Sequence, residues 1–161
     1  MEFIVSVDQN LGIGANNNLL FSFKEDMKHF KNVTTDGIVI MGRKTFESLD
    51  NKPLPNRTNI VLTHKTDLEG VTCCSSVQEV LDICDRLDKK TFVIGGEKVF
   101  KQMLPYCDGG YITFVNETFF SDTVFPDIFK MGFVLDNLIS QGTFMHRGQE
   151  IDYKICHVRK V

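Results

Sequence analysis

The sequence has no tryptophan, no long apolar run and no cluster of lysines or arginines. Because no basic stripe could follow a phosphate backbone, and the net charge is −3, the composition argues against a nucleic-acid partner. No segment reaches the roughly 18 consecutive apolar residues of a membrane span, and the N-terminus lacks the basic and apolar regions of a signal peptide. We therefore expect a soluble, cytoplasmic protein without a membrane partner.

Motifs for metal binding and covalent catalysis are also absent. The five cysteines form no C-x-x-C pair and no Cys/His grouping with zinc spacing, so we expect free thiols and no metal site. There is no G-x-S-x-G, and Gly12-Ile13-Gly14 lacks the third glycine of a dinucleotide fingerprint. Gly42-Arg43-Lys44 does not fit a P-loop either. A serine nucleophile, a Rossmann domain and a Walker-type nucleotide site are excluded.

Apolar segments of strand character alternate with segments of helical periodicity. The run Ile38–Met41 indicates a strand buried on both faces, while Phe23, Met27 and Phe30 recur with the spacing of one helix face. We predict an α/β fold in a single domain of residues 1–161, with three layers: a mostly parallel central sheet, helices on both faces and a C-terminal antiparallel edge hairpin. Strands are expected at 3–7, 38–41, 59–63, 91–94 and 111–115, helices at about 24–32, 45–49, 77–87 and 97–104, and the hairpin at 133–139 and 150–159 around Gly142 and Gly148.

Two serines are each followed by glutamate three residues later, a pattern typical of helix starts. Ser22 with Glu25 precedes the first helix, and Ser76 with Glu79 precedes apolar positions up to residue 87. The stretch 8–21 between the first strand and the first helix shows little periodicity. We expect it to be a functional loop.

Two glycine turns follow buried strands. At Gly42-Arg43-Lys44-Thr45 a strand turns into a helix that begins with two cations, which favours a phosphate site; a plain turn with two solvated cations is the alternative. Gly95-Gly96 would let a ligand lie directly against the backbone. Because open α/β sheets bind nucleotides at the carboxyl ends of their strands, we expect both turns to line one ligand site.

Asp26 is the candidate chemical group. Helical steps from Phe23 and Phe30 place its carboxylate on the apolar side of the first helix. Burying an unpaired carboxylate is costly, so the position indicates a function; the alternative is that Asp26 only stabilises the positive N-terminus of its helix. With one acid and a phosphate-bearing ligand, we expect assistance to proton transfer, with a cofactor supplying the remaining chemistry.

Five blocks of the sequence together resemble dihydrofolate reductase in order and spacing. They are Leu11–Gly14, Asp26 with Phe30, Ile40–Ser48, Leu54–Asn59 and Val93–Glu97. The resemblance extends over essentially the whole chain. It implies reduction of 7,8-dihydrofolate to tetrahydrofolate with NADPH, by hydride transfer to C6 and protonation of N5. It also implies antifolate-type ligands, a monomer and a role in one-carbon and thymidylate metabolism.

The resemblance assigns the catalytic and substrate-binding residues. Asp26 matches the acid that hydrogen-bonds the pterin and favours protonation of N5, and Thr113 matches the threonine that supports this carboxylate. Arg57 matches the partner of the glutamate α-carboxylate, which a guanidinium can bind with two parallel hydrogen bonds. The pterin and benzoyl rings are expected to contact Val5, Ser6, Met27, Phe30, Leu49 and Leu54.

The resemblance also assigns an NADPH site. The two glycine turns match the segments that hold the pyrophosphate and the adenosine phosphates, with a cis peptide bond inside Gly95-Gly96. Arg43, Thr63 and Lys98 match positions near the 2′-phosphate, so NADPH is expected over NADH, and the loop 10–21 closes over the nicotinamide. The cofactor set is Ser6, Ile13, Gly42, Arg43, Lys44, Thr45, Thr63, His64, Ile94, Gly95, Gly96, Glu97, Lys98 and Val99.

The sequence departs from the family where the missing tryptophan belongs. Phe21, Phe23 and Lys24 stand in the places of the family's Trp and Leu-Pro, so the indole N–H that helps to anchor an active-site water is missing. Two alternatives stay open: a folate- and NADPH-binding protein with weak or no catalysis, and a pyrimidine reductase of riboflavin synthesis. The second lacks the folate-type acid and the glutamate-binding arginine, so Asp26 and Arg57 argue against it.

Overall fold

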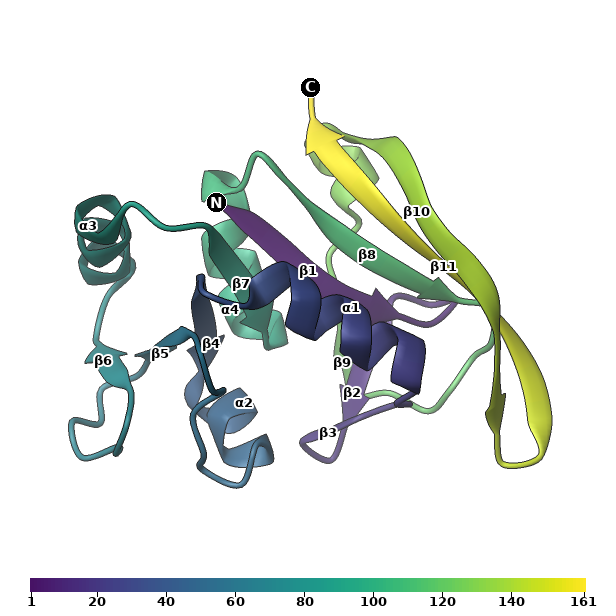
Figure 1. Ribbon diagram of the computed structural model, residues 1–161, viewed down its shortest axis with the longest axis horizontal. Helices are drawn as coiled ribbons and strands as arrows, with labels where there is room; N and C mark the ends of the chain where they lie inside the picture. Colours follow the sequence, from purple (N-terminus) through teal and green to yellow (C-terminus); the bar gives the residue numbers. More distant parts are fainter.

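The computed structural model describes residues 1–161 and is built around an eight-stranded sheet (Figure 1). The strands lie in the order β10-β11-β8-β1-β7-β4-β5-β6. Neighbouring strands run parallel except at β8–β11 and β10–β11, which confirms the predicted α/β fold with its C-terminal edge hairpin. The strands are β1 (Glu2–Val7), β4 (Ile38–Gly42), β5 (Thr58–Leu62), β6 (Thr72–Cys74), β7 (Thr91–Gly95), β8 (Gly109–Val115), β10 (Phe133–His146) and β11 (Gln149–Lys160).

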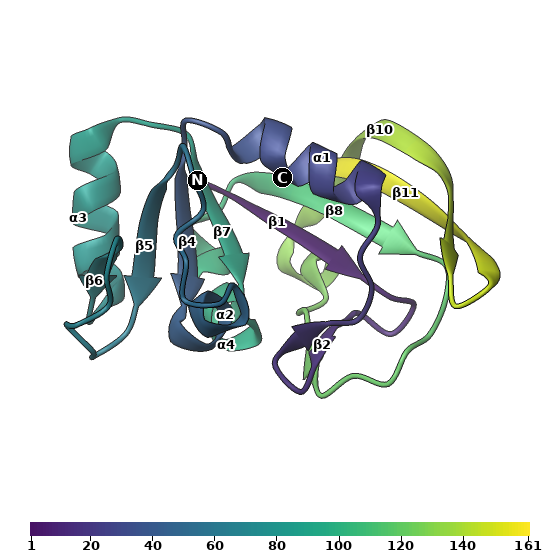
Figure 2. The same cartoon turned by 60° about the horizontal axis from the view of Figure 1, so that its bottom comes forward.

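Helices cover both faces of the sheet, as predicted. Because successive strand residues point to opposite faces, Ile40 belongs to the core that includes Val80 and Phe100, whereas Val39 packs in the core of Phe46. The first helix lies across β1 and β8 (Figures 1 and 2). None of the helices combines the length and the apolar character needed to cross a bilayer. The helices are α1 (Lys24–Thr34), α2 (Arg43–Ser48), α3 (Val77–Leu87) and α4 (Glu97–Met103), with the 3-10 turns η1 (Leu104–Tyr106) and η2 (Ile128–Met131).

The stretch between β1 and α1 is not an irregular loop. β2 (Gly12–Ala15) and β3 (Asn18–Leu19) pair with each other, and β2 also pairs with β9 (Thr123–Val124), so that a second, three-stranded sheet forms. These strands have two to four residues, too few to show an alternating pattern in the sequence. We call residues 8–19 the β2–β3 arm.

Only one of the two predicted helix caps is formed. The Ser76 hydroxyl accepts a hydrogen bond from the backbone N–H three residues later, as predicted. The prediction for Ser22 is wrong: Phe23 is the N-cap of α1 without a side-chain hydrogen bond, and the Ser22 hydroxyl donates to the Met27 sulfur at 3.2 Å. The ring of Phe23 stacks on Phe144 with 4.0 Å between centroids, so tertiary packing holds the residue in an extended conformation.

The C-terminal hairpin is longer than predicted, and its turn is tighter. Arg147 and Gly148 form the turn with positive φ, between the paired residues His146 and Gln149. Gly142 is not part of a turn but lies within β10 opposite Tyr153, where a Cβ would come within 3.0 Å of the tyrosine hydroxyl. This glycine is explained by close packing rather than by backbone conformation.

All five cysteines are free. Cys74, Cys107 and Cys156 are buried, and burial raises the pKa of the Cys107 thiol to about 12. Such a thiol stays protonated near neutral pH and acts as a small apolar side chain.

His157 on β11 connects three strands at the hairpin side of the sheet. Its Nε2 lies 2.7 Å from the Glu2 carboxylate on β1, and its Nδ1 lies 2.9 Å from the Asp136 carboxylate on β10. Burial lowers the pKa of His157, but the hydrogen bonds to the two carboxylates outweigh this effect and leave the pKa above its usual value. The protonated imidazole donates to both carboxylates at once.

We expect this contact to make stability depend on pH. Because the folded-state pKa is raised, the stabilisation is complete below the unfolded-state pKa of about 6.5 and is lost as the pH rises through the folded-state value. His157→Gln should lower the free energy of unfolding by about 1–2 kcal/mol at about pH 5.5, and by progressively less at higher pH. Denaturant titrations over a pH series measure this difference. His146→Gln, at a hairpin histidine without an ion pair, is the control, and a pH-independent difference would contradict the assignment.

Candidate active site

The Asp26 carboxylate is held by two strands of the central sheet. One oxygen accepts a hydrogen bond from the Ser6 hydroxyl on β1 at 2.6 Å, and the other accepts one from the Thr113 hydroxyl on β8 at 2.7 Å. Ser6 and Thr113 are direct register partners, so both hydroxyls rise from one place on the sheet face beneath α1. The predicted contact between Asp26 and Thr113 is therefore present. Each carboxylate oxygen keeps further acceptor capacity for a ligand.

Asp26 is half-buried and paired, rather than buried and unpaired as its helical position suggested. The difference arises because the sequence pattern places the carboxylate on the inner side of α1 but does not show which polar groups the sheet presents there. A half-buried carboxylate in a fixed orientation, with one side still open, is suited to bind a polar ring.

His29, one helical turn after Asp26, does not form an ion pair with the Asp26 carboxylate. His29 packs edge-on against Tyr111, and its buried Nε2 has no hydrogen-bond partner. Burial lowers the pKa of His29, and the nearby Asp26 charge only partly opposes this shift. The imidazole is therefore neutral near pH 7 and leaves the carboxylate as the local charge.

The apolar side chains near Asp26 are incompletely covered. Met27 is 62% exposed and Phe30 is half-buried, which corrects the expectation that they form a buried face of α1 with Phe23. Of the other predicted substrate contacts, Val5 lies in the core, while Leu49 and Leu54 are half-buried beside the Phe46 core. Uncovered apolar side chains next to an oriented carboxylate are typical of a site for a flat, partly polar ligand.

Arg57 lies at the other end of α1 from Asp26. Its guanidinium donates to the Thr34 hydroxyl at 3.0 Å and to the Pro55 carbonyl at 2.9 Å, and it lies 5.8 Å from the centre of the Phe30 ring. Burial lowers the pKa of Arg57, although it stays cationic near neutral pH. Thr34 follows Asp26 by eight positions on α1, which corresponds to a rise of about 12 Å along the helix axis, so the acid and the cation lie toward opposite ends of the helix.

The two glycine turns meet at the carboxyl ends of neighbouring strands, as expected. Met41 of β4 is the register partner of Gly95 of β7, and the Gly95-Gly96 bond is cis. The side chain of Thr45, the last residue of the first turn, faces the second turn. A Cβ on Gly96 would lie 3.4 Å from the Thr45 hydroxyl, and a Cβ on Gly95 would lie 3.5 Å from it. Gly95 also has a φ of 136°, which disfavours any residue with a side chain.

Several cations and hydroxyls border these turns. Arg43 forms an ion pair with Glu47 one helical turn away, and Lys44 and Lys98 are exposed. Thr63 follows Leu62, the partner of Gly42, so it lies beside the first turn, and its hydroxyl accepts from the Lys65 N–H. His64 is exposed, while Ile13 and Ile94 are half-buried.

Two predicted cofactor residues have side chains engaged elsewhere. Val99 is buried in the core and packs toward Gly42, where a Cβ would lie 3.1 Å from one of its methyl groups. The Glu97 carboxylate accepts a hydrogen bond from the backbone N–H of Val124 on β9 and lies 3.9 Å from Lys101. For both residues only the backbone is left to contact a ligand at the turn.

Asp8 organises the β2–β3 arm and was missed by the sequence patterns. This buried carboxylate accepts hydrogen bonds from the backbone N–H groups of Asn10 and Gly12 on one oxygen and of Phe119 on the other. The only signal is an acidic residue directly after a buried strand and four residues before a glycine. That pattern is common in loops and does not distinguish this role.

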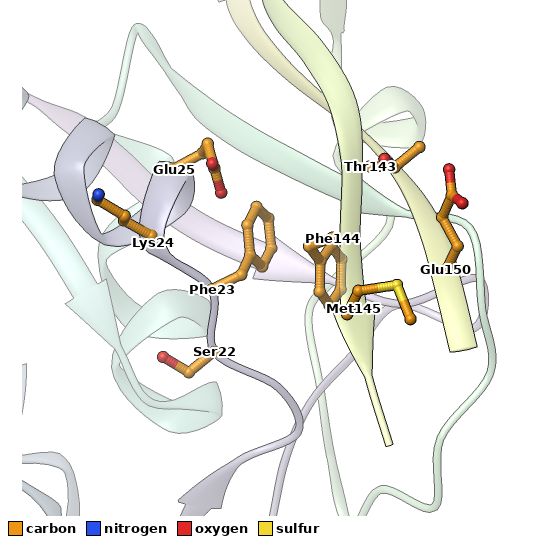
Figure 3. Close-up of a pocket in the computed structure, with 8 residues that line it drawn as sticks. All are labelled: Ser22, Phe23, Lys24, Glu25, Thr143, Phe144, Met145 and Glu150. Carbon is orange, nitrogen blue, oxygen red and sulfur yellow. The ribbon is translucent and has the colours of Figure 1, made fainter. Parts of the chain in front are cut away.

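Phe21 and Phe23, which stand where the sequence lacks the expected tryptophan, belong to an aromatic core. Phe21 and Phe23 pack with Phe144 and Tyr153, and Phe119 lies against this group. A surface hollow of about 520 Å³ borders the group, and Figure 3 shows Phe23 and Phe144 face to face in it. It is lined by Ser22, Phe23, Lys24, Glu25, Thr143, Phe144, Met145 and Glu150, and so contains neither Asp26 nor Arg57.

No group of three or more His, Cys, Asp or Glu side chains is arranged to hold a metal ion. The chemistry that the arrangement supports rests on one oriented carboxylate, one cation at the far end of α1 and a pair of glycine turns.

Comparisons with known proteins agree on one family. A sequence profile described as "Dihydrofolate reductase" matches residues 1–159. The chain is 43% identical over 129 residues to the dihydrofolate reductase of Bacillus subtilis, covering 79% of this chain and 76% of that protein. It is 38% identical over 128 residues to the enzyme of Staphylococcus aureus, covering 78% and 77%. A solved structure of dihydrofolate reductase from Enterococcus faecalis, complexed with NADP(H) and RAB-propyl, superposes with a TM-score of 0.80 at 35% identity, covering 98% of this chain and 95% of that one.

Proposed function

The chain belongs to the dihydrofolate reductase family, and from this membership we propose that the surface along α1 between Asp26 and Arg57 binds 7,8-dihydrofolate for reduction to tetrahydrofolate. The protein is an NADPH-dependent oxidoreductase, and bound NADPH supplies the hydride that reaches C6 of the pterin. The observation that carries the proposal is the Asp26 carboxylate, oriented by Ser6 and Thr113 near the start of α1, with Arg57 bound to Thr34 at the end of the same helix.

Asp26 would hold the pterin and favour the proton at N5. A carboxylate fixed by two hydroxyl donors presents its remaining lone pairs in one direction, which suits the 2-amino and N3 groups of the pterin. Its negative charge, next to partly apolar surroundings, would stabilise a protonated N5. Thr113 keeps this orientation from the sheet side. The rings would pack against Val5, Ser6, Met27, Phe30, Leu49 and Leu54.

Arg57 would bind the glutamate α-carboxylate of the substrate. Its separation from Asp26 of about 12 Å along α1 suits a ligand with a polar ring at one end and a carboxylate at the other. The bonds to Thr34 and Pro55 hold the guanidinium in place before the ligand arrives. Pre-organisation of this kind reduces the entropy cost of binding.

The glycine turns fit NADPH. The Thr45 hydroxyl lies within van der Waals reach of both Gly95 and Gly96, and the positive φ of Gly95 favours a glycine there, whose backbone a ligand can approach closely. Arg43, Lys98 and Thr63 would surround the 2′-phosphate. To bind it, the Arg43 guanidinium would give up its ion pair with Glu47 and pair with the phosphate. Glu97 and Val99 would contribute only backbone groups. The remaining members of the cofactor site are Ser6, Ile13, Gly42, Lys44, Thr45, His64, Ile94, Gly95 and Gly96.

A NADPH-oxidation assay tests the proposal. Purified protein should consume NADPH at 340 nm only when dihydrofolate is present, and methotrexate should stop the reaction. Protein that binds NADPH and methotrexate without turnover would favour the alternative of a folate-binding protein. The missing indole N–H is the reason for considering that alternative. Turnover of a pyrimidine of riboflavin synthesis instead of dihydrofolate would support the other alternative.

We also propose that residues 1–161 form one domain that acts as a monomer in the cytoplasm and binds antifolate-type inhibitors beside Asp26. Five free cysteines suit a reducing compartment. Sedimentation analysis of the purified protein, with and without methotrexate, measures the oligomeric state.

A further inference from the structure

The β2–β3 arm is attached to the segment 119–125 along its whole length. Val124 of β9 pairs with Gly12, the Asp122 carboxylate accepts from the Asn16 N–H at 2.9 Å, and the Phe125 N–H donates to the Leu11 carbonyl at 2.7 Å. The arm therefore cannot move without the 119–125 segment, or without breaking these bonds. Whatever fixes the segment also fixes the arm that carries Ile13.

The Glu97 carboxylate connects that segment to the cofactor turn by a hydrogen bond, beside the packing of Phe125 on Phe100 of α4. Glu97 is the first residue of α4 and follows Gly95-Gly96 directly. Its Oε1 accepts a hydrogen bond from the Val124 N–H at 3.1 Å, across 27 residues of sequence. Val124 in turn lies opposite Gly12 of β2. A continuous path of bonds thus runs from the glycine turn through Glu97 and β9 to the arm.

The same hydrogen bond also determines where the negative charge of Glu97 lies. A carboxylate that pointed from Glu97 toward the turn would repel the phosphates of a bound dinucleotide, because charges closer than a Debye length of about 8 Å are only partly screened. The hydrogen bond to Val124 holds the carboxylate on the β9 side, while the largely exposed Lys101 ammonium at 3.9 Å adds little to this.

We propose that Glu97 is a positioning residue that ties the Gly95-Gly96 turn to β9 and the β2–β3 arm, so that NADPH binding at the turn and ordering of the arm favour each other. The proposal rests on the NADPH site proposed above. Coupling of this kind is reciprocal: a bond that stabilises the binding-competent arrangement raises cofactor affinity, and the bound cofactor stabilises the arm.

The test compares Glu97→Ala, which removes the acceptor, with Glu97→Gln, which keeps an Oε1 acceptor but no charge. Lys101→Gln is the matched control because it removes the ion-pair partner and leaves the bond to Val124. We expect Glu97→Ala to raise the Kd for NADPH about 3- to 10-fold, while Glu97→Gln and Lys101→Gln stay within about twofold of wild type. The Kd for methotrexate without cofactor should be unchanged in all variants.

Hydrogen exchange provides a readout that a general loss of stability would not imitate. NADPH should slow exchange of the Val124 amide and of residues 12–15 in the wild type, and this added protection should be lost in Glu97→Ala, with thermal unfolding as a check on folding. Unchanged affinity and exchange in Glu97→Ala would overturn the coupling. Equal loss in Glu97→Gln would also overturn it, because charge rather than the hydrogen bond would then be responsible. Wild-type protein that fails to bind NADPH would instead contradict the proposed function.

Discussion

Asp26→Asn should reduce turnover with dihydrofolate by at least about 100-fold at pH 7, with the fold intact. Asparagine has the same shape, and its carbonyl oxygen can still accept from Ser6 or Thr113. It lacks the negative charge that stabilises the proton at N5, so the substrate must be protonated from solution. Steady-state rates from about pH 5 to 9 should therefore show a steeper rise toward acidic pH than the wild type.

Glu25→Gln is the matched control for this experiment. Glu25 is the neighbouring carboxylate on α1, but it is exposed and lies one helical step away from Asp26, with no bond to Ser6 or Thr113. This variant should keep a wild-type rate and pH profile. A near-wild-type rate in Asp26→Asn would remove Asp26 from the mechanism, and equal losses in both variants would point to the overall charge of α1 instead.

Arg57→Leu should raise the KM for dihydrofolate about 10- to 100-fold with little change in kcat. The guanidinium would bind the glutamate α-carboxylate, far from the reacting atoms, so its loss weakens substrate and transition state alike. Folding should be preserved because the Thr34 hydroxyl keeps its own bond to the Phe30 carbonyl. Initial rates over a range of dihydrofolate concentrations, at saturating NADPH, measure both constants.

Arg57→Lys separates charge from geometry. Lysine keeps the cation but cannot form two parallel hydrogen bonds, so we expect a KM between those of wild type and Arg57→Leu. An antifolate without a glutamate tail should bind wild type and both variants equally. An unchanged KM in Arg57→Leu would place the carboxylate-binding site elsewhere.

The secondary structure was predictable where one physical pattern dominates. β4 is covered on both faces, and its residues from Ile38 to Met41 are fully buried, so the unbroken apolar run identified it. The cap at Ser76 was predictable because it is a local bond within an exposed helix end. The cap at Ser22 was not, since the stacking of Phe23 on Phe144, across about 120 residues of sequence, decides where α1 begins.

The candidate site was predictable to a similar extent. The sequence placed Asp26 on the inner side of α1 and a glycine at the end of each of two buried strands, and the resemblance added Thr113. It could not show that Ser6 would hold the second oxygen of Asp26, because that contact depends on the register of β1 and β8.

The sequence by itself determined the succession along the chain of the longer strands and the helices, the glycine turns at Gly42 and Gly95-Gly96, and the family, because each follows from local periodicity or from motifs in register. Only the tertiary structure decided the pairing of the Asp26 carboxylate, the exposure of Met27, and the use of the Asp8 and Glu97 carboxylates to hold the β2–β3 arm. These features depend on which distant backbone and side-chain groups meet, and no local pattern encodes that.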